Sequence, residues 1–188
     1  MTPLGPAVLA LLLAAAAGTA AAVPFERTLE HKGIRFHVSS ANDAAVNTLR
    51  IVPSGLAESN APIERTVDGT VTGADVADLD ADGSPEIYVY ATSAGSGSYG
   101  TLVAYAASKR RALALIHLAP VTANKAAAAG YMGHDTFAIS RNALVQRFPV
   151  YRDGDANAKP SGGTRELHYR LVADGAAWRL RLERIVER

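Results

Sequence analysis

Apolar and polar residues alternate in short runs along most of the chain, and turn-forming residues separate the runs. The clearest run is EIYVYAT at residues 86–92, which puts aliphatic side chains on one face and two tyrosines on the other. Because successive side chains of a strand point to opposite faces, this alternation predicts β-strands. The other runs of this kind cover residues 33–39, 47–52, 101–106, 112–118, 136–140, 144–151, 165–172 and 178–182.

The residues between these runs predict how the strands connect. Asp68-Gly69 is typical of a tight hairpin, and Asp174-Gly175 predicts a turn that joins the last two strands. Residues 153–163 (DGDANAKPSGG) form a long polar turn inside a hairpin, and residues 122–129 (TANKAAAA) favour a short helix. No linker or repeat divides the chain. These features predict one all-β domain over residues 23–188, an antiparallel β-sandwich with at most one short helix. An α+β fold is the alternative.

The first 22 residues differ in composition from the rest. They carry no charged side chain, and residues 7–17 are an unbroken apolar run. That run is too short to span a bilayer, which takes about 20 apolar residues. Small residues at positions 20–22 fit the cleavage site of a secretory signal. We therefore predict a signal peptide over residues 1–22, an exported mature protein and no membrane contact after cleavage.

The overall composition narrows the function further. The chain has 188 residues, 19 Lys and Arg against 18 Asp and Glu, and no cysteine. A net charge of +1 gives no basis for binding nucleic acid. Without disulfides the domain depends on its own core, and about 166 residues is enough for one. Nothing in the sequence points to a cofactor, and the oligomeric state stays open, a homodimer being compatible with it.

The stretch TSAGSGSYG at residues 92–100 is the most unusual segment. Residues 95–100 match G-x-G-x-x-G, but a dinucleotide site needs a following helix and an acidic residue about 20 positions later. The next run alternates as a strand, and no Asp or Glu occurs between Glu86 and Asp135. The segment is therefore a hairpin loop, either a solvated connector or, because Tyr99 stands among small hydroxyl residues, a recognition loop. The basic residues Lys109, Arg110 and Arg111 follow nearby; we favour a solvated charge run over a role in attracting a partner.

The segment at residues 78–100, DLDADGSPEIYVYATSAGSGSYG, resembles the periplasmic inhibitors of I-type (invertebrate) lysozyme, and the resemblance continues through residues 148–172. The resemblance implies a β-sandwich that is not an enzyme and whose partner is an I-type lysozyme. It also implies that a Ser-Gly-x-Tyr loop enters the active-site cleft of the lysozyme. Carried over to this chain, the inhibitory loop is Ser96, Gly97, Ser98 and Tyr99.

The second candidate site is DLDADG. Asp78, Asp80, Asp82 and Glu86 occupy positions 1, 3, 5 and 9 of a calcium-loop pattern, whereas position 12 is a valine, which excludes a standard EF-hand. We favour an Asp-Gly turn whose side chains cap their own backbone, and assign no metal. The alternative function is a calcium-dependent extracytoplasmic binding module that uses this loop. An exported hydrolase is a third hypothesis, but no nucleophile and base can be assembled from the motifs.

Overall fold

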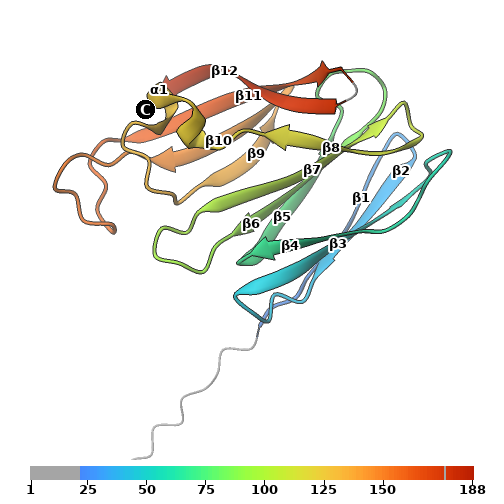
Figure 1. Cartoon of the computed structure of the whole chain (residues 1–188), viewed down its shortest axis with the longest axis horizontal. Helices are drawn as coiled ribbons and strands as arrows, with labels where there is room; N and C mark the ends of the chain where they lie inside the picture. Colours follow the sequence, from blue (N-terminus) through green and yellow to red (C-terminus); the bar gives the residue numbers. More distant parts are fainter. Residues whose placement is uncertain (1–21, 176) are drawn as a thin grey trace, which may run out of the picture.

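The computed structural model describes residues 22–175 and 177–188, so the predicted signal peptide lies outside the described residues except for Ala22. Strands make up almost all of the regular secondary structure of the described chain, which confirms the all-β prediction (Figure 1). The strands are β1 (Phe25–His31), β2 (Ile34–Ser40), β3 (Val46–Ser54), β4 (Ile63–Asp68), β5 (Thr70–Ala77), β6 (Glu86–Thr92), β7 (Gly100–Ser108), β8 (Ala112–Leu118), β9 (Thr136–Ser140), β10 (Ala143–Pro149), β11 (Thr164–Asp174) and β12 (Ala177–Glu187).

Helical structure is confined to a short segment between β8 and β9. A 3₁₀ turn, η1 (Val121–Ala123), leads into α1 (Lys125–Ala128). Asn124 caps α1, because its side-chain oxygen accepts hydrogen bonds from the N–H groups of Ala126 and Ala127. The predicted short helix is thus confirmed in a shorter form. Within the described residues no helix is long and apolar enough to cross a membrane.

The strands form two sheets. One has the order β1-β2-β3-β4, and the other has the order β5-β6-β7-β8-β12-β11-β10-β9. Neighbouring described strands pair antiparallel except β8 and β12, which pair in parallel from Trp178 opposite Ile116 to Leu180 opposite Leu118. The larger sheet is therefore mixed, a detail that alternation of residues could not reveal because it carries no strand direction.

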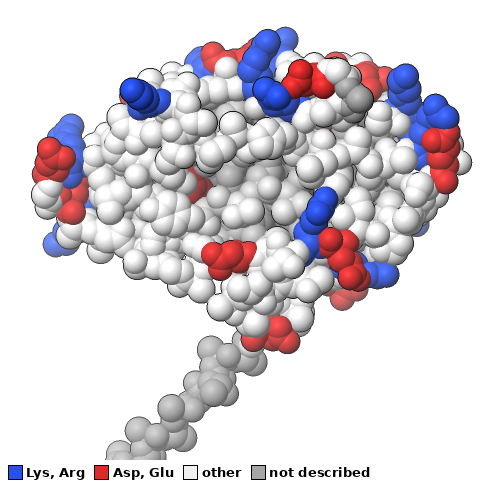
Figure 2. All heavy atoms as spheres, viewed as in Figure 1, with Lys and Arg blue, Asp and Glu red and all other residues white. Residues whose placement is uncertain are grey.

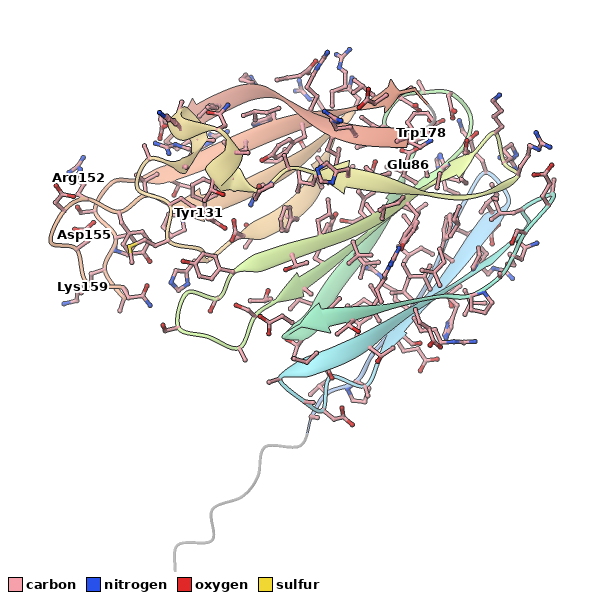
Figure 3. The ribbon with its side chains drawn as sticks, viewed as in Figure 1. Glu86, Tyr131, Arg152, Asp155, Lys159 and Trp178 are labelled. Atoms are coloured by element: carbon pink, nitrogen blue, oxygen red, sulfur yellow. The ribbon has the colours of Figure 1, made fainter. Side chains whose placement is uncertain are left out.

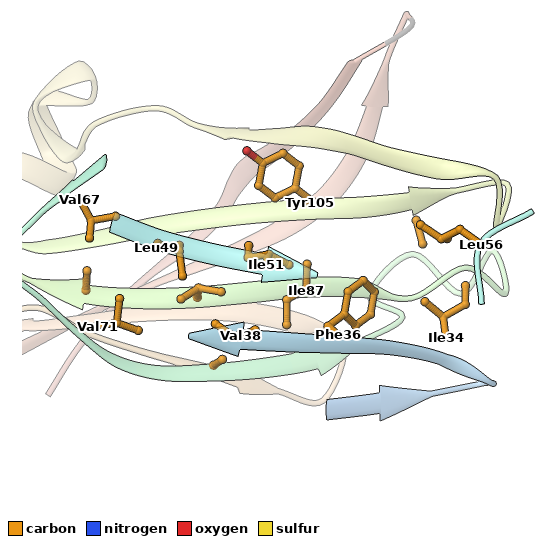
Figure 4. Close-up of a cluster of buried hydrophobic side chains, with 14 residues drawn as sticks. Ile34, Phe36, Val38, Leu49, Ile51, Leu56, Val67, Val71, Ile87 and Tyr105 are labelled. Atoms are coloured by element: carbon orange, nitrogen blue, oxygen red, sulfur yellow. The ribbon is translucent and has the colours of Figure 1, made fainter. Parts of the chain in front are cut away.

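Two hydrophobic clusters lie on opposite faces of β6. Ile87, Val89 and Ala91 belong to a cluster shared with the smaller sheet (Figure 4). Tyr88 and Tyr90 belong to a second cluster, shared with β8 and β10–β12. The alternation predicted for EIYVYAT is correct, but both faces are buried, so β6 is a central strand between two cores. This double burial holds the strand firmly in place.

The turn at Asp68-Gly69 is not a hairpin, which corrects the prediction from its sequence. β4 pairs with β3 in the smaller sheet, whereas β5 pairs with β6 in the larger one. Gly69 has a φ of +88°, and a Cβ there would collide with the backbone oxygen of Thr92. The glycine allows a sharp change of sheet beside the end of β6, where the chain could not accommodate a side chain.

Candidate functional site

The predicted inhibitory segment lies in the loop between β6 and β7, residues 93–99, which we call the β6–β7 loop. The two strands pair up to Thr92 and Gly100, so the loop closes a hairpin. The Ser93 N–H donates to the Tyr99 oxygen and the Tyr99 N–H donates to Ser93 Oγ, both at 2.9 Å. The Ser98 N–H donates to the Gly95 oxygen at 2.9 Å. The loop is therefore closed by its own hydrogen bonds in spite of its glycine content.

The loop presents its hydroxyl groups outward. Ser96 is exposed, Ser98 is partly exposed, and 48% of Tyr99 is accessible. The hydroxyls of Ser96, Ser98 and Tyr99 form no hydrogen bond with any described residue, whereas the Tyr99 ring packs edge-to-face on Tyr131 with ring centroids 5.8 Å apart. The ring thus rests on the rim of the molecule and is not buried beneath its sheet, so its polar end is free to meet a partner.

Two segments distant in sequence brace this loop from outside. The backbone N–H of His134 donates to the Gly97 oxygen at 2.7 Å, and Asn157 Nδ2 donates to the Ser96 oxygen at 2.8 Å. His134 Nε2 and Asn157 Oδ1 are 3.2 Å apart, which links the two braces. Hydrogen bonds to these two separate parts of the chain restrict the conformations open to the β6–β7 loop.

A buried polar group, Asp135, lies next to the end of the loop. Its carboxylate accepts hydrogen bonds from the Gly100 N–H at 2.9 Å, the Tyr131 hydroxyl at 2.8 Å and Gln146 Nε2 at 2.7 Å. Burial, followed by the hydrogen bond to Asp135, raises the pKa of Tyr131 well above its ordinary range, so this phenol keeps its proton. The network fixes the start of β7 and the aromatic support of Tyr99 together.

Asn157 belongs to the loop between β10 and β11, residues 150–163, which we call the β10–β11 loop. Asp155 orders it by accepting from the N–H groups of Arg152 and Ser161, each at 2.8 Å, and these bonds lower the pKa of Asp155. Arg152 and Lys159 are exposed on this loop and form no ion pair with a described residue (Figure 3). The predicted polar turn is present, and it lies beside the β6–β7 loop, which the sequence did not predict.

The surface around the β6–β7 loop carries few charges. Figure 2 shows a broad uncharged face, with most Lys, Arg, Asp and Glu side chains gathered toward its margins. A hollow of about 410 Å³ opens beside the loop, and its lining includes Tyr99, Leu102, Leu118 and Tyr131. This part of the molecule therefore combines unpaired hydroxyls with an apolar hollow.

The basic residues that follow the loop in sequence lie far from it in the structure. β7 leads away from the loop, and Lys109, Arg110 and Arg111 follow its far end. Arg111 pairs with Glu58, and Arg110 donates to the oxygens of Lys32 and Gly83. These two arginines therefore connect other turns and do not border the β6–β7 loop.

The DLDADG carboxylates come together in the connection between β5 and β6. One oxygen from each of Asp78, Asp80, Asp82 and Glu86 can be chosen so that all four lie within 4.8 Å of one another. Burial and then the charges of Asp80 and Asp78 raise the pKa of Glu86 to about 8. Backbone capping is also present, because Asp80 accepts from the Asp82 N–H and Asp82 from the Ser84 N–H. The cluster therefore combines the predicted capping with an arrangement open to a cation.

Sequence reasoning identified the exposed tip of the site but not its supports. Ser96, Gly97, Ser98 and Tyr99 share one loop, as the sequence predicts, whereas the acidic cluster lies at the other end of β6. His134, Asn157 and Tyr131 were missed as partners of the loop. The length of the polar turn at residues 153–163 was the one available signal, since long loops in compact domains often carry function.

Comparison with protein families gives one match. Residues 61–134 match the family described as periplasmic lysozyme inhibitor of I-type lysozyme, which confirms the resemblance over that range. The matched range extends from the segment before β4 to His134 and includes both the acidic cluster and the β6–β7 loop. It does not reach the β10–β11 loop. Comparisons with curated proteins and with solved structures give no match.

Proposed function

We propose, from the match of residues 61–134 to the inhibitors of I-type lysozyme, that this protein is a periplasmic inhibitor of such an enzyme. The β6–β7 loop enters the active-site cleft of the lysozyme and blocks substrate binding. The protein is then not an enzyme itself, and its effect is to protect the bacterial cell wall from a host lysozyme.

The observation that carries the proposal is the free, outward-facing set of hydroxyls on a braced loop. Glycoside hydrolysis generally uses two carboxylic groups that flank the scissile bond. Ser96, Ser98 and Tyr99 offer donors to such groups, and each hydrogen bond to a charged acceptor contributes about 1.5–3 kcal/mol. The Tyr99 ring, half exposed, can occupy the place of a sugar ring.

The bracing of the loop matters for affinity. Ordering an interface side chain on binding costs about 0.5–1.5 kcal/mol, and a loop held before binding avoids part of that cost. Two or three hydrogen bonds alone would still give weak binding, since stable inhibitor complexes bury about 1,600 Å² in total. The uncharged face and the hollow beside the loop supply additional surface for the partner, and the neighbouring β10–β11 loop carries the exposed basic residues Arg152 and Lys159.

The direct test is inhibition of cell-wall lysis by an I-type lysozyme. We expect near-stoichiometric protection by the purified mature protein, and loss of that protection in the double variant Ser96→Ala with Tyr99→Ala. Ser54→Ala, at an exposed site at the end of β3, is the matched control and should inhibit normally. Thermal denaturation verifies that each variant is folded. Unchanged lysis with a tenfold excess of wild-type protein would contradict the proposed function.

A further inference from the structure

The connection between β5 and β6 concentrates negative charge. Asp78, Asp80, Asp82 and Glu86 offer oxygens that all lie within 4.8 Å of one another. Two ligands of one calcium ion can be at most about 4.8 Å apart, twice the usual calcium–oxygen distance of about 2.4 Å, so every pair of these oxygens meets the separation that a shared ion requires. The four residues occupy alternate positions of one tight loop, apart from a longer step to Glu86 at the start of β6.

Two of these carboxylates are buried, and one of them has a buried oxygen without a partner. Glu86 is only 1% exposed, and the side chain of Asp78 is 7% exposed. Asp78 Oδ2 accepts from Lys32 and from the Gly83 N–H, but Asp78 Oδ1 is buried with no hydrogen-bond partner among the described residues. A buried carboxylate oxygen without a partner is costly, because it loses its hydration and gains nothing in return. A cation at this position would satisfy that oxygen.

The cations on the protein do not balance the cluster. Lys32 forms the one ion pair made by the four carboxylates within the described chain, with Nζ 2.5 Å from Asp78 Oδ2. Arg110 comes near, but its guanidinium donates to the backbone oxygens of Gly83 and Lys32. Four acidic groups thus face one ammonium that is itself 46% exposed. Another positive charge among the oxygens would relieve their mutual repulsion.

We propose that Asp78, Asp80, Asp82 and Glu86 bind a calcium ion. Calcium accepts six to eight oxygen ligands in flexible geometries, and carboxylates are its usual protein ligands. Magnesium is smaller and requires near-octahedral geometry at about 2.0–2.1 Å, which suits this open group of oxygens less well. Asp78 Oδ1, the unpartnered oxygen, becomes satisfied by the ion.

The role of the ion is structural. Glu86 begins β6, and the β6–β7 loop follows the other end of the same strand; Figure 3 shows Glu86 far from Tyr131, which supports that loop. Calcium would tie the β5–β6 connection to the first residue of the central strand and would not touch a partner at the β6–β7 loop. The proposal therefore does not rest on lysozyme inhibition, and it can fail or succeed independently.

The test is calcium-dependent thermal stability of the purified mature protein. Extracellular calcium modules have dissociation constants of about 0.1–1 mM. At 10 mM CaCl₂ such a site raises the Tm by about 3–10 °C over the value in EDTA. Magnesium chloride at the same concentration should give a clearly smaller shift. No calcium-dependent shift in the wild type, or an equal shift with magnesium, overturns the assignment.

The informative variant is Asp80→Asn with Asp82→Asn. An amide oxygen at each position can still accept the backbone N–H that the carboxylate accepts now, so the turn is preserved. Because two repelling charges are removed, the Tm of this variant in EDTA should equal or exceed that of the wild type. Its rise in Tm with calcium should be clearly smaller, because an amide oxygen can still bind calcium but carries no charge. Asp153→Asn, in the exposed β10–β11 loop, is the control and should respond like the wild type. A calcium response of the double variant as large as that of the wild type contradicts the proposed ligands.

Discussion

The Tyr99 ring packs over Gly97, so a substitution at Gly97 can move this ring without removing any hydroxyl from the loop. A Cβ added at Gly97 would lie 2.5 Å from Tyr99 Cε2 and 3.0 Å from Cδ2, closer than such contacts occur. The backbone of Gly97 lies outside the left-handed region, so alanine is compatible with its conformation. Gly97→Ala therefore displaces the Tyr99 ring and leaves the loop backbone able to keep its course.

The expected effect on stability is small. Displacing the ring from Tyr131 loses an edge-to-face contact worth about 0.5–1.5 kcal/mol. Alanine also makes the unfolded chain less flexible than glycine does, which stabilises the fold by about 0.4–1 kcal/mol. The lost ring contact and this gain nearly cancel. For a domain of this size, a net change below about 1 kcal/mol moves the Tm by no more than about 4 °C.

The expected effect on inhibition is large. If Tyr99 is a hot spot of the interface, misplacing it costs at least about 2 kcal/mol, which weakens inhibition about 30-fold or more. The assay is titration of I-type lysozyme in cell-wall lysis, with Tm measured in parallel. Gly95→Ala is the matched control, because a Cβ at Gly95 meets nothing within 4 Å. If Gly97→Ala inhibits as well as Gly95→Ala, the placement of the ring does not matter and the argument from geometry is refuted.

Two further predictions concern residues away from the loop tip. Asn157→Ala removes the donor to the loop and should weaken inhibition about 3- to 10-fold in the lysis assay, with a Tm within about 2 °C of wild type because the residue is exposed; unchanged inhibition would contradict the bracing. The second concerns the pKa of Glu166. Burial raises this pKa, but hydrogen bonds with Arg147, Arg188 and His168 lower it more strongly, so that it falls from 4.5 to about 2. Because its folded pKa is depressed, Glu166 stabilises the fold above pH 4.5, and this contribution disappears as the pH falls toward 2. We expect this contribution to the free energy of unfolding to be about 1–2 kcal/mol, since both arginines are more than half exposed and their charges are screened by solvent. In urea denaturation, the difference in free energy of unfolding between wild type and Glu166→Gln should therefore shrink as the pH falls from 4.5 toward 2. A difference that stays constant over this range would contradict the stabilising role of Glu166.

The strands could be predicted from the sequence because their signal is local. In the run EIYVYAT, alternation assigned each side chain to the correct face of β6. It could not show that both faces are buried, since a tyrosine is compatible with a core or with the surface. Asp68-Gly69 shows the other limit: the dipeptide specifies a sharp turn, but which strands pair on either side depends on contacts with distant parts of the chain.

The site could be predicted only where its residues are consecutive. Ser96 and Tyr99 stand together in one motif, and the structure places both on the surface. The supporting residues are separated from Ser96 by up to 61 positions, as for Asn157. Such pairs have no spacing that a single sequence can reveal. Lys109 shows the converse, because a residue near the loop in sequence lies at the far end of a strand that leads away from it.

The glycines of the β6–β7 loop serve close packing more than freedom of movement. A Cβ at Gly97 would strike the Tyr99 ring, and one at Gly100 would come within 2.6 Å of Asp135 Cβ. Gly133 on the neighbouring segment has a φ of +90°, and a side chain there would collide with the Gly97 oxygen. Gly97, Gly100 and Gly133 thus let another group approach to a distance that no other residue permits, whereas a Cβ at Gly95 would meet nothing within 4 Å. A composition typical of a flexible linker therefore yields a loop braced by two other segments, and it is this braced backbone that can hold unpaired hydroxyls toward a partner.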